Sequence, residues 1–242
     1  MEDRLRNGRA GRQQNRPEMT PRADPAGFIL ANTRIHAVPH APEIRLYLAD
    51  EAMDLWQKTE DDLGALGLPP PFWAFAWAGG QAVARLVLDR PELVRGRRVM
   101  DFATGGGVAA IAAALAGAAR VDAVDIDPFA TAAARLNARI NGAEINTLTE
   151  DLVGQLPPPG RPEIVMAGDV CYEKPMAERV FAWLRALAGD GVLVLLGDPA
   201  RAYAPRDGVE ALAVIDVPTV IEIEDKPQRR TTVWRVLPAP VA

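Results

Sequence analysis

The stretch VMDFATGGG at residues 99–107 decides the fold of this chain. An apolar segment ends in the carboxylate of Asp101, turns through consecutive glycines from Gly105 to Gly107, and continues into a helix of small residues, VAAIAAALAGA. A second apolar segment, which lies within VDAVDID at 121–127, ends in Asp125. Glycine permits a sharp turn and close approach of a ligand, the following helix offers unpaired N–H groups, and the second acid suits a ribose diol. The pattern predicts a nucleoside-containing cofactor at the carboxyl ends of parallel strands.

The charge beside the glycines narrows the choice of cofactor. The spacing Gly105-x-Gly107-x-x-Ala110 also fits a dinucleotide fingerprint, and a turn that only packs a strand against a helix is a further alternative. Asp101 favours a cationic ligand, because a carboxylate there repels a pyrophosphate and attracts the ammonium and sulfonium groups of S-adenosylmethionine. We therefore expect S-adenosylmethionine as the cofactor.

Composition excludes several classes of protein. With 242 residues, 49% of them hydrophobic, the chain is expected to form one α/β domain with an N-terminal extension. Its formal net charge of −5 argues against binding to nucleic acid. The absence of serine excludes a serine nucleophile, and the single cysteine, Cys171, excludes an intrachain disulfide. His36, His40 and that cysteine make a poor ligand set, so no metal is expected.

The first residues raise the question of targeting. Six arginines lie in residues 1–22, together with acids and without an apolar core, which argues against a secretory signal. We interpret residues 1–26 as a disordered tail; a mitochondrial transit peptide is the alternative, against which the acids and the missing serine count. No apolar run has the length of a membrane span. We expect a cytoplasmic monomer that does not bind membranes.

Residues 27–69 are interpreted as an N-terminal cap that contacts the substrate. FILANTRIHAV (28–38) is predicted to be a short helix, EIRLYLA (43–49) a strand, and DEAMDLWQKTEDDLGALG (50–67) a helix with a glycine stop. Residues 70–242 form the predicted catalytic domain.

Short strands and helices alternate through most of this domain. Strands are predicted at 97–103, 120–126, 144–148, 163–168 and 191–197, and helices at 79–90, 107–117, 128–141 and 175–188. Such alternation favours a parallel sheet with helices on both faces. The final segments, VPTVIEIED (217–225) and TTVWRVLP (231–238), read as a hairpin. The expected fold is an α/β, Rossmann-like, seven-stranded mixed sheet with six parallel strands and one antiparallel strand.

This combination resembles the class I, seven-strand S-adenosylmethionine-dependent methyltransferases over residues 70–237. A dinucleotide enzyme would need a second βαβ half in place of the hairpin. The resemblance implies that one loop wraps the methionine part of the cofactor, through Asp101, Ala103, Thr104, Gly105 and Gly107. The family usually has glycine where this chain has Ala103, and we expect the loop to tolerate the extra methyl group.

The second and third strands are expected to bind the nucleoside. By resemblance, Asp125 is the ribose ligand, although Asp127 would face the same way along an extended segment. The alternative role for Asp127 is to cap the helix that begins at Pro128. Ile126 would then lie against the adenine. Asp151 follows the third strand and is our candidate for the adenine amino group; the alternative is an ordinary solvated acid.

The segment DVCYE at 169–173 follows the fourth strand, where the transferred methyl group should emerge. It resembles the Asp-x-x-Tyr/Phe signature of lysine methyltransferases that act on non-histone proteins. The resemblance implies that Asp169 binds the incoming lysine beside the cofactor and that Tyr172 bounds the channel with its aromatic face. The alternative is that Asp169 caps the next helix and Tyr172 packs. Cys171 is expected to be a buried apolar residue.

The aromatic run PFWAFAWAGGQ at 71–81 is the other unusual segment. Phe72 and Phe75 are expected in the core. By resemblance, Trp77, Gly80 and Gln81 border the cofactor pocket, with Gln81 donating to the cofactor carboxylate near a helix N-terminus.

Together with GDPAR at 197–201, these motifs resemble the electron transfer flavoprotein β-subunit lysine methyltransferases, with the ribosomal protein L11 methyltransferases as relatives. The separate N-terminal domain and Asn-Pro-Pro-Tyr-type motif of the L11 enzymes are not in this sequence. The expected function is protein-lysine N-methylation by direct in-line transfer, with the flavoprotein β-subunit as partner and Asp169 orienting the lysine. The alternatives are an L11-like or other protein methyltransferase, a non-catalytic cofactor-binding module and a dinucleotide oxidoreductase.

Overall fold

The computed structural model describes residues 24–50, 70–155, 161–219 and 221–240. The predicted tail falls almost entirely outside these residues, and the predicted helix at 50–67 lies outside them apart from Asp50. Within the described part of the chain, no helix is both long and apolar enough to cross a membrane.

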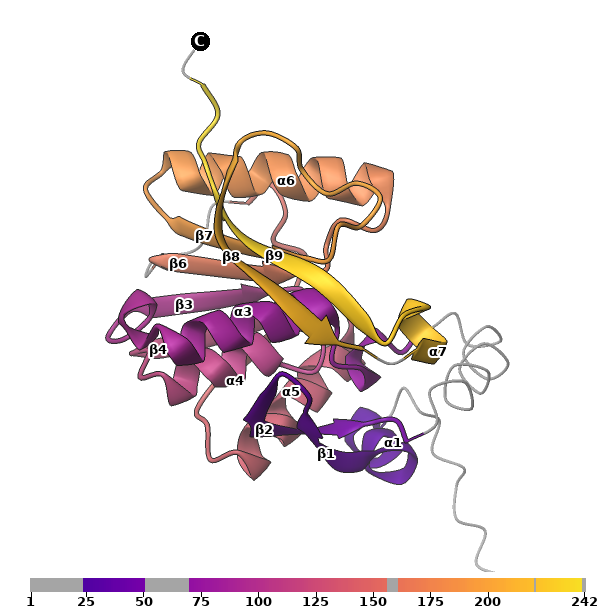
Figure 1. Ribbon diagram of the computed structural model, residues 1–242. Coiled ribbons are helices and arrows are strands. Elements are labelled where there is room, and N and C mark those ends of the chain that lie inside the picture. Colours follow the sequence, from indigo (N-terminus) through magenta and orange to yellow (C-terminus); the bar gives the residue numbers. More distant parts are fainter. Residues whose placement is uncertain (1–23, 51–69, 156–160, 220, 241–242) are drawn as a thin grey trace, which may run out of the picture.

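A seven-stranded sheet with the order β5-β4-β3-β6-β7-β9-β8 forms the centre of the molecule (Figure 1). β9 lies between β7 and β8 and is antiparallel to both, whereas the pairs from β5 to β7 are parallel. This arrangement confirms the Rossmann-like mixed sheet with an inserted antiparallel strand. The strands are β3 (Arg98–Phe102), β4 (Arg120–Asp125), β5 (Asn146–Thr149), β6 (Ile164–Gly168), β7 (Leu193–Asp198), β8 (Val209–Pro218) and β9 (Gln228–Val236).

Helices cover both faces of the sheet (Figure 1). Adjacent residues of β6 show the two faces, because Met166 contributes to the core beneath α3 and α4, and Val165 to the core beneath α6. The small side chains of α4, VAAIAAAL, are mostly buried and allow close packing against α3. The helices are α3 (Ala78–Asp89), α4 (Val108–Leu115) and α5 (Pro128–Ile140) on one face and α6 (Lys174–Gly189) on the other, with 3-10 turns η2 (Phe72–Ala74) and η3 (Pro91–Leu93).

The N-terminal segment packs against α5. It consists of α1 (Pro25–Asn32) and an antiparallel hairpin of β1 (Arg34–Val38) and β2 (Ala41–Leu48). The predicted helix over 28–38 is therefore wrong in its second half. The helix ends because Thr33 is extended, with its hydroxyl donating to the carbonyl of Ile29 at 2.6 Å, and the following residues pair with β2. The expected strand at 43–49 is confirmed as β2.

The C-terminal hairpin is confirmed, but its first strand was placed too late in the sequence. β8 ends at Pro218, which pairs with Gln228, and residues 221–224 form the short helix α7 (Ile221–Glu224). Thr219 closes the connection by donating from its backbone N to the carbonyl of Pro227 at 3.0 Å and from its hydroxyl to Lys226. The long β9 needs an equally long partner, and the alternating segment before Pro218 supplies it.

Candidate active site

Asp101 connects the end of β3 to the start of α4. Its Oδ2 accepts hydrogen bonds from the Thr104 hydroxyl at 2.6 Å and the backbone N of Ala110, in the first turn of α4, at 3.1 Å. The N-cap of α4 is Gly107, which has no side chain to offer, so Asp101 satisfies a helix N–H group that would otherwise lack a partner. Burial raises the pKa of Asp101 to about 7, opposed by these hydrogen bonds.

The segment 103–107, which we call the glycine turn, bends through left-handed conformations. Ala103, Gly105 and Gly107 have φ values of 54°, 51° and 85°. A Cβ atom on Gly107 would lie 2.9 Å from the Cβ of Ala134, whereas a Cβ on Gly105 would meet no atom within 4 Å. Gly107 is therefore required by packing, and Gly105 faces open space. Ala103 retains the backbone conformation expected of glycine, at a strain of about 1–2 kcal/mol.

The two acids near the end of β4 have different roles. Asp125 lies close to the glycine turn, and its Oδ2 accepts from the backbone N of Gly105 at 3.0 Å. Asp127 accepts from the backbone N of Phe129 at 2.9 Å and caps α5, with Pro128 as the first helical residue. The capping role weighed for Asp127 is thus the one in the structure. Between them, the apolar side chain of Ile126 is 72% exposed.

A narrow pocket lies beside the glycine turn, at the carboxyl ends of β3 and β6. It brings together most residues predicted for the methionine end of the cofactor, and Leu46 of β2 adds an apolar wall. Gly107, the N-cap of α4, is not one of its lining residues. The lining residues are Leu46, Phe75, Trp77, Gly80, Asp101, Ala103, Thr104, Gly105, Gly106, Val108, Ala109, Gly168 and Asp169.

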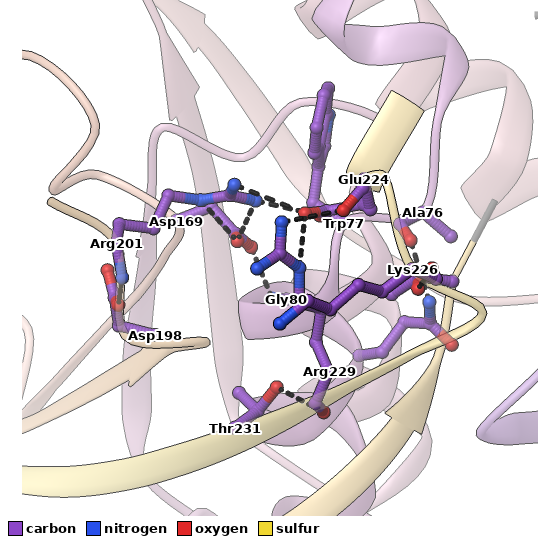
Figure 2. Close-up of polar contacts among 12 residues, drawn as sticks. Ala76, Trp77, Gly80, Asp169, Asp198, Arg201, Glu224, Lys226, Arg229 and Thr231 are labelled. Atoms are coloured by element: carbon purple, nitrogen blue, oxygen red, sulfur yellow. Dashed lines mark hydrogen bonds and ion pairs between the residues drawn. The ribbon is translucent and has the colours of Figure 1, made fainter. Parts of the chain in front are cut away.

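Asp169 follows β6 and faces the start of α3 (Figure 2). Its Oδ2 accepts from the backbone N of Gly80 at 3.0 Å, and its Oδ1 accepts from Nη2 and Nε of Arg201 at 2.7 and 3.2 Å. Asp169 therefore does for α3 what Asp101 does for α4, since each satisfies an N–H group of the first helical turn from a neighbouring strand. Burial and the charge of Asp198 raise the pKa of Asp169 to about 6, against the opposing effect of Arg201.

Glycines allow this close approach of helix and strands. A Cβ on Gly79 would lie 2.3 Å from the carbonyl O of Gly197 and 2.6 Å from Oδ2 of Asp169. A Cβ on Gly168 would lie 2.6 Å from the backbone N of Gly80. The start of α3 therefore rests directly on the ends of β6 and β7.

A charged cluster beside Asp169 was not predicted from the sequence. We call it the Arg201 cluster, and it consists of Asp169, Arg201, Glu224 and Arg229. Arg201 donates to Glu224 through Nη2 and Nη1, at 2.8 and 3.2 Å, and its guanidinium lies 5.4 Å from the centre of the Trp77 ring. Arg201 was quoted within GDPAR but given no role. Its position just after the buried strand β7, at the same sheet edge as Asp101 and Asp169, was the available signal.

Gln81 does not line the pocket. Its side chain is buried, accepts from the backbone N of His40 at 3.0 Å, and donates to the carbonyls of Ala76 and Pro218 at 2.6 and 3.3 Å. Gln81 therefore ties together three segments of the chain. This set of internal contacts gives no support to its expected bond with the cofactor.

Three further residues that the sequence singled out, Asp151, Tyr172 and Cys171, are not among the residues that line the pocket. Asp151 follows β5, accepts from the backbone N of Val153 and pairs with Arg179 at 3.2 Å on the surface. Tyr172 is 47% exposed, with its ring 5.6 Å from that of Phe72. Cys171 is buried, and burial together with Asp198 raises its pKa to about 12, so it is a neutral thiol as expected.

The site fits a cationic nucleoside cofactor in three respects. Open space lies beside Gly105, a buried carboxylate of Asp101 lines the pocket, and the apolar Ile126 is exposed at the sheet edge where a nucleobase would cover it. With the inserted antiparallel strand, these features define a class I S-adenosylmethionine-dependent methyltransferase.

Comparison with known proteins identifies the family. A family model described as ribosomal protein L11 methyltransferase (PrmA) matches residues 86–168. The electron transfer flavoprotein beta subunit lysine methyltransferase of Xenopus laevis is 40% identical over 188 residues, covering 77% of this chain and 74% of that protein. The Danio rerio protein of the same name is 34% identical over 219 residues, covering 88% and 83%. The chain belongs to the electron transfer flavoprotein beta subunit lysine methyltransferase family.

Among solved structures, magnesium protoporphyrin IX methyltransferase from Synechocystis, with bound S-adenosylmethionine, gives a TM-score of 0.48 at 23% identity, covering 65% of this chain and 79% of that one. Family membership confirms the expected enzyme class: the protein is an S-adenosylmethionine-dependent protein-lysine methyltransferase.

Proposed function

We propose that this enzyme methylates lysine in the β-subunit of electron transfer flavoprotein. The observation that carries the proposal is the match to relatives named for that substrate, at 40% and 34% identity over most of the chain. The L11 methyltransferase model matches only residues 86–168, which hold the glycine turn and Asp125 but none of the C-terminal hairpin. That match therefore carries little information about the protein substrate.

We propose that one edge of the sheet holds the cofactor. Asp101, Ala103, Thr104, Gly105 and Gly107 would surround its methionine part, since most of them line the pocket or shape its turn. When bound, S-adenosylmethionine supplies a methyl group activated by its sulfonium charge. The residues proposed for the nucleoside are Asp125 for the ribose, Ile126 for the adenine face and Asp151 for the adenine amino group.

Asp169 is proposed to orient the substrate lysine. Its carboxylate lines the pocket and keeps one lone pair, on Oδ2, after accepting from Gly80 and twice from Arg201, so it can accept from an amine. A free lysine has a pKa of about 10.4, and the pKa of Asp169 of about 6 makes it a weak base for that proton. The proton is therefore expected to pass to solvent. Trp77 and Tyr172 would bound the path of the lysine with aromatic surfaces.

The test is methyl transfer into purified candidate proteins. The enzyme is incubated with labelled S-adenosylmethionine and either electron transfer flavoprotein or ribosomal protein L11, and the modified residue is identified by mass spectrometry. We expect methyl-lysine in the flavoprotein β-subunit and none with Asp169→Asn. Label in L11 alone would contradict the proposed substrate.

We also propose a cytoplasmic, monomeric enzyme whose residues 27–69 contact the protein substrate. The buried position of Cys171, the only cysteine, supports a protein that does not rely on an oxidising compartment. Light scattering during gel filtration tests the monomer, and a larger particle at micromolar concentration would contradict it.

A further inference from the structure

We infer that Arg201 is the positioning residue for Asp169, fixing its carboxylate so that the remaining lone pair of Oδ2 faces the substrate lysine. This inference rests on the proposed role of Asp169. Two donors of Arg201 converge on Oδ1, and the backbone N of Gly80 binds Oδ2. With both oxygens held by these donors, the carboxylate can neither rotate nor withdraw, while Oδ2, which accepts only from Gly80, keeps one lone pair to accept from the lysine.

Arg201 can do this because it is itself held on several sides (Figure 2). Its guanidinium pairs with Glu224 and lies against the ring of Trp77. Its backbone N donates to Oδ1 of Asp198 at 2.7 Å, which fixes the start of its segment. The side chain is only 16% exposed. Such a guanidinium is preorganised, so its side chain loses little conformational entropy when the substrate binds.

The C-terminal hairpin supplies the outer anchor. Glu224, at the end of α7, is 4% exposed, and Arg229 of β9 donates to its backbone carbonyl at 2.6 Å and pairs with its carboxylate at 3.4 Å. The Arg201 cluster therefore links Asp169, the residue proposed to orient the lysine, to α7 and β9. A lysine in place of Arg201 could bind the carboxylate of Asp169 or that of Glu224 but not both in the same way, because an ammonium group lacks the planar fork of donors of a guanidinium.

Charge gives Arg201 a second effect on Asp169. The charged and titratable groups around Asp169 are Asp198 at the end of β7, Cys171 in the same loop as Asp169, Arg201, and Glu224 behind Arg201. Of these, Arg201 favours the ionised form of Asp169, and burial and Asp198 oppose it. Loss of Arg201 should therefore raise the pKa of Asp169, so that the group stays protonated up to a higher pH. A protonated carboxyl group accepts a hydrogen bond from an amine less well than a carboxylate does.

The experiment measures kcat/KM for the protein substrate against pH, at saturating S-adenosylmethionine, in the full-length enzyme. For the wild type, log kcat/KM should rise with slope one through neutral pH as the lysine loses its proton. Below a break near the pKa of Asp169, at about 6, the slope should increase to two. Asp169→Asn should lack this break and lose most of its activity.

We expect Arg201→Gln to lower kcat/KM about 10–100-fold, the effect of losing hydrogen bonds to a charged group. Its break should move upward by about one to three pH units. Arg201→Lys should keep the break near the wild-type value but recover only part of the rate. Affinity for S-adenosylhomocysteine should stay within a few-fold throughout. Arg120→Gln, which removes an exposed pair with Asp122 away from the site, is the matched control.

Arg201→Gln with near-normal kcat/KM or an unmoved break would overturn the inference, and so would an increase in kcat/KM, which would make Arg201 a competitor of the lysine. If Arg201→Gln fails to fold, Glu224→Gln tests the same point, because it weakens the anchor of Arg201 and leaves the pair with Asp169. Glu224→Gln should then lower kcat/KM several-fold, and an unchanged value would refute the inference. Activity in Asp169→Asn would remove the premise as well, whereas an inactive Asp169→Asn beside a fully active Arg201→Gln would remove only the role of Arg201.

Discussion

The carboxylate of Asp125 accepts a hydrogen bond from the backbone N of Gly105 at 3.0 Å, so the acid that ends β4 is tied to the turn that follows β3. Its other oxygen accepts from the backbone N of Asp127 at 3.0 Å. The two sequence motifs that first suggested a cofactor site are therefore one connected unit. A change in the acid affects both the ligand that it would bind and the turn that it holds.

Asp125→Ala should weaken binding of S-adenosylhomocysteine about 10–100-fold, because a charged acceptor is lost and Gly105 loses its partner. Titration calorimetry measures the affinity. Asp127→Asn is the matched control, since asparagine also caps helices, and it should bind within a few-fold of the wild type. Equal losses in the two variants would show that the ribose ligand is not Asp125 alone.

Cofactor affinity should depend on the protonation of Asp101. Burial raises its pKa to about 7, so at pH 5.5 the group is mostly neutral without cofactor, whereas a cationic ligand favours the carboxylate. Affinity for S-adenosylmethionine should therefore increase from pH 5.5 to 7, by up to about tenfold per unit, with protons released on binding. Calorimetry in buffers of different ionisation enthalpy measures both quantities. Asp101→Asn should flatten the dependence, and an equally steep dependence in that variant would assign it to another group.

Gly79→Ala should destabilise the protein and abolish methyl transfer. The added methyl group would lie 2.3 Å from the carbonyl O of Gly197 and 2.6 Å from Oδ2 of Asp169, so α3 must move away from the strand ends. Overpacking of this kind costs about 1–3 kcal/mol in the free energy of unfolding, measured by urea denaturation. Gly189→Ala is the control, because its Cβ would meet Pro238 at an ordinary 3.9 Å. A stable, active Gly79→Ala enzyme would show that α3 does not need to lie so close to the ends of β6 and β7.

Asn137→Ala should lower stability and weaken cofactor binding together. Asn137 is fully buried in α5, where its side chain accepts from the backbone N of Tyr47 at 2.7 Å and donates to the carbonyl of Gly106 at 2.8 Å. Each buried group left without a partner costs about 1–3 kcal/mol in the free energy of unfolding. Urea denaturation and calorimetry measure the two effects. The exposed Asn146→Ala should change neither, and a loss of stability with unaltered affinity would separate Asn137 from the glycine turn.

The parallel half of the sheet was predicted well because its local signals agree with one another. β3, β4 and the helices after them lie within a few residues of their expected bounds, since buried strands are continuous apolar runs and the glycines and Pro128 mark the turns. Asp101 and Asp125 were found for the same reason. Asp125 ends β4 and Asp101 lies one residue before the end of β3, and the carboxyl ends of neighbouring parallel strands meet at one edge.

The errors lie where distant segments decide the structure. Residues 34–38 pair with β2, and β8 takes its register from β9, so neither could be assigned from local propensity. Gln81 has internal partners from three separate segments, and nothing near it in the sequence indicates them. Arg201 was given no role because its two partners, Asp169 and Glu224, are distant from it in sequence, and Glu224 belongs to a segment that was expected to be a strand.

The position of β9 between β7 and β8 has a consequence for the order in which the sheet assembles. β9 follows β8 in sequence but occupies an interior place in the sheet, and it carries Arg229, the partner of Glu224. The parallel strands from β5 to β7 can pair with one another first, whereas β8 is joined to β7 through β9 and enters the sheet with it. A folding intermediate without docked β9 would therefore have the glycine turn but lack the contacts that hold Arg201 from behind.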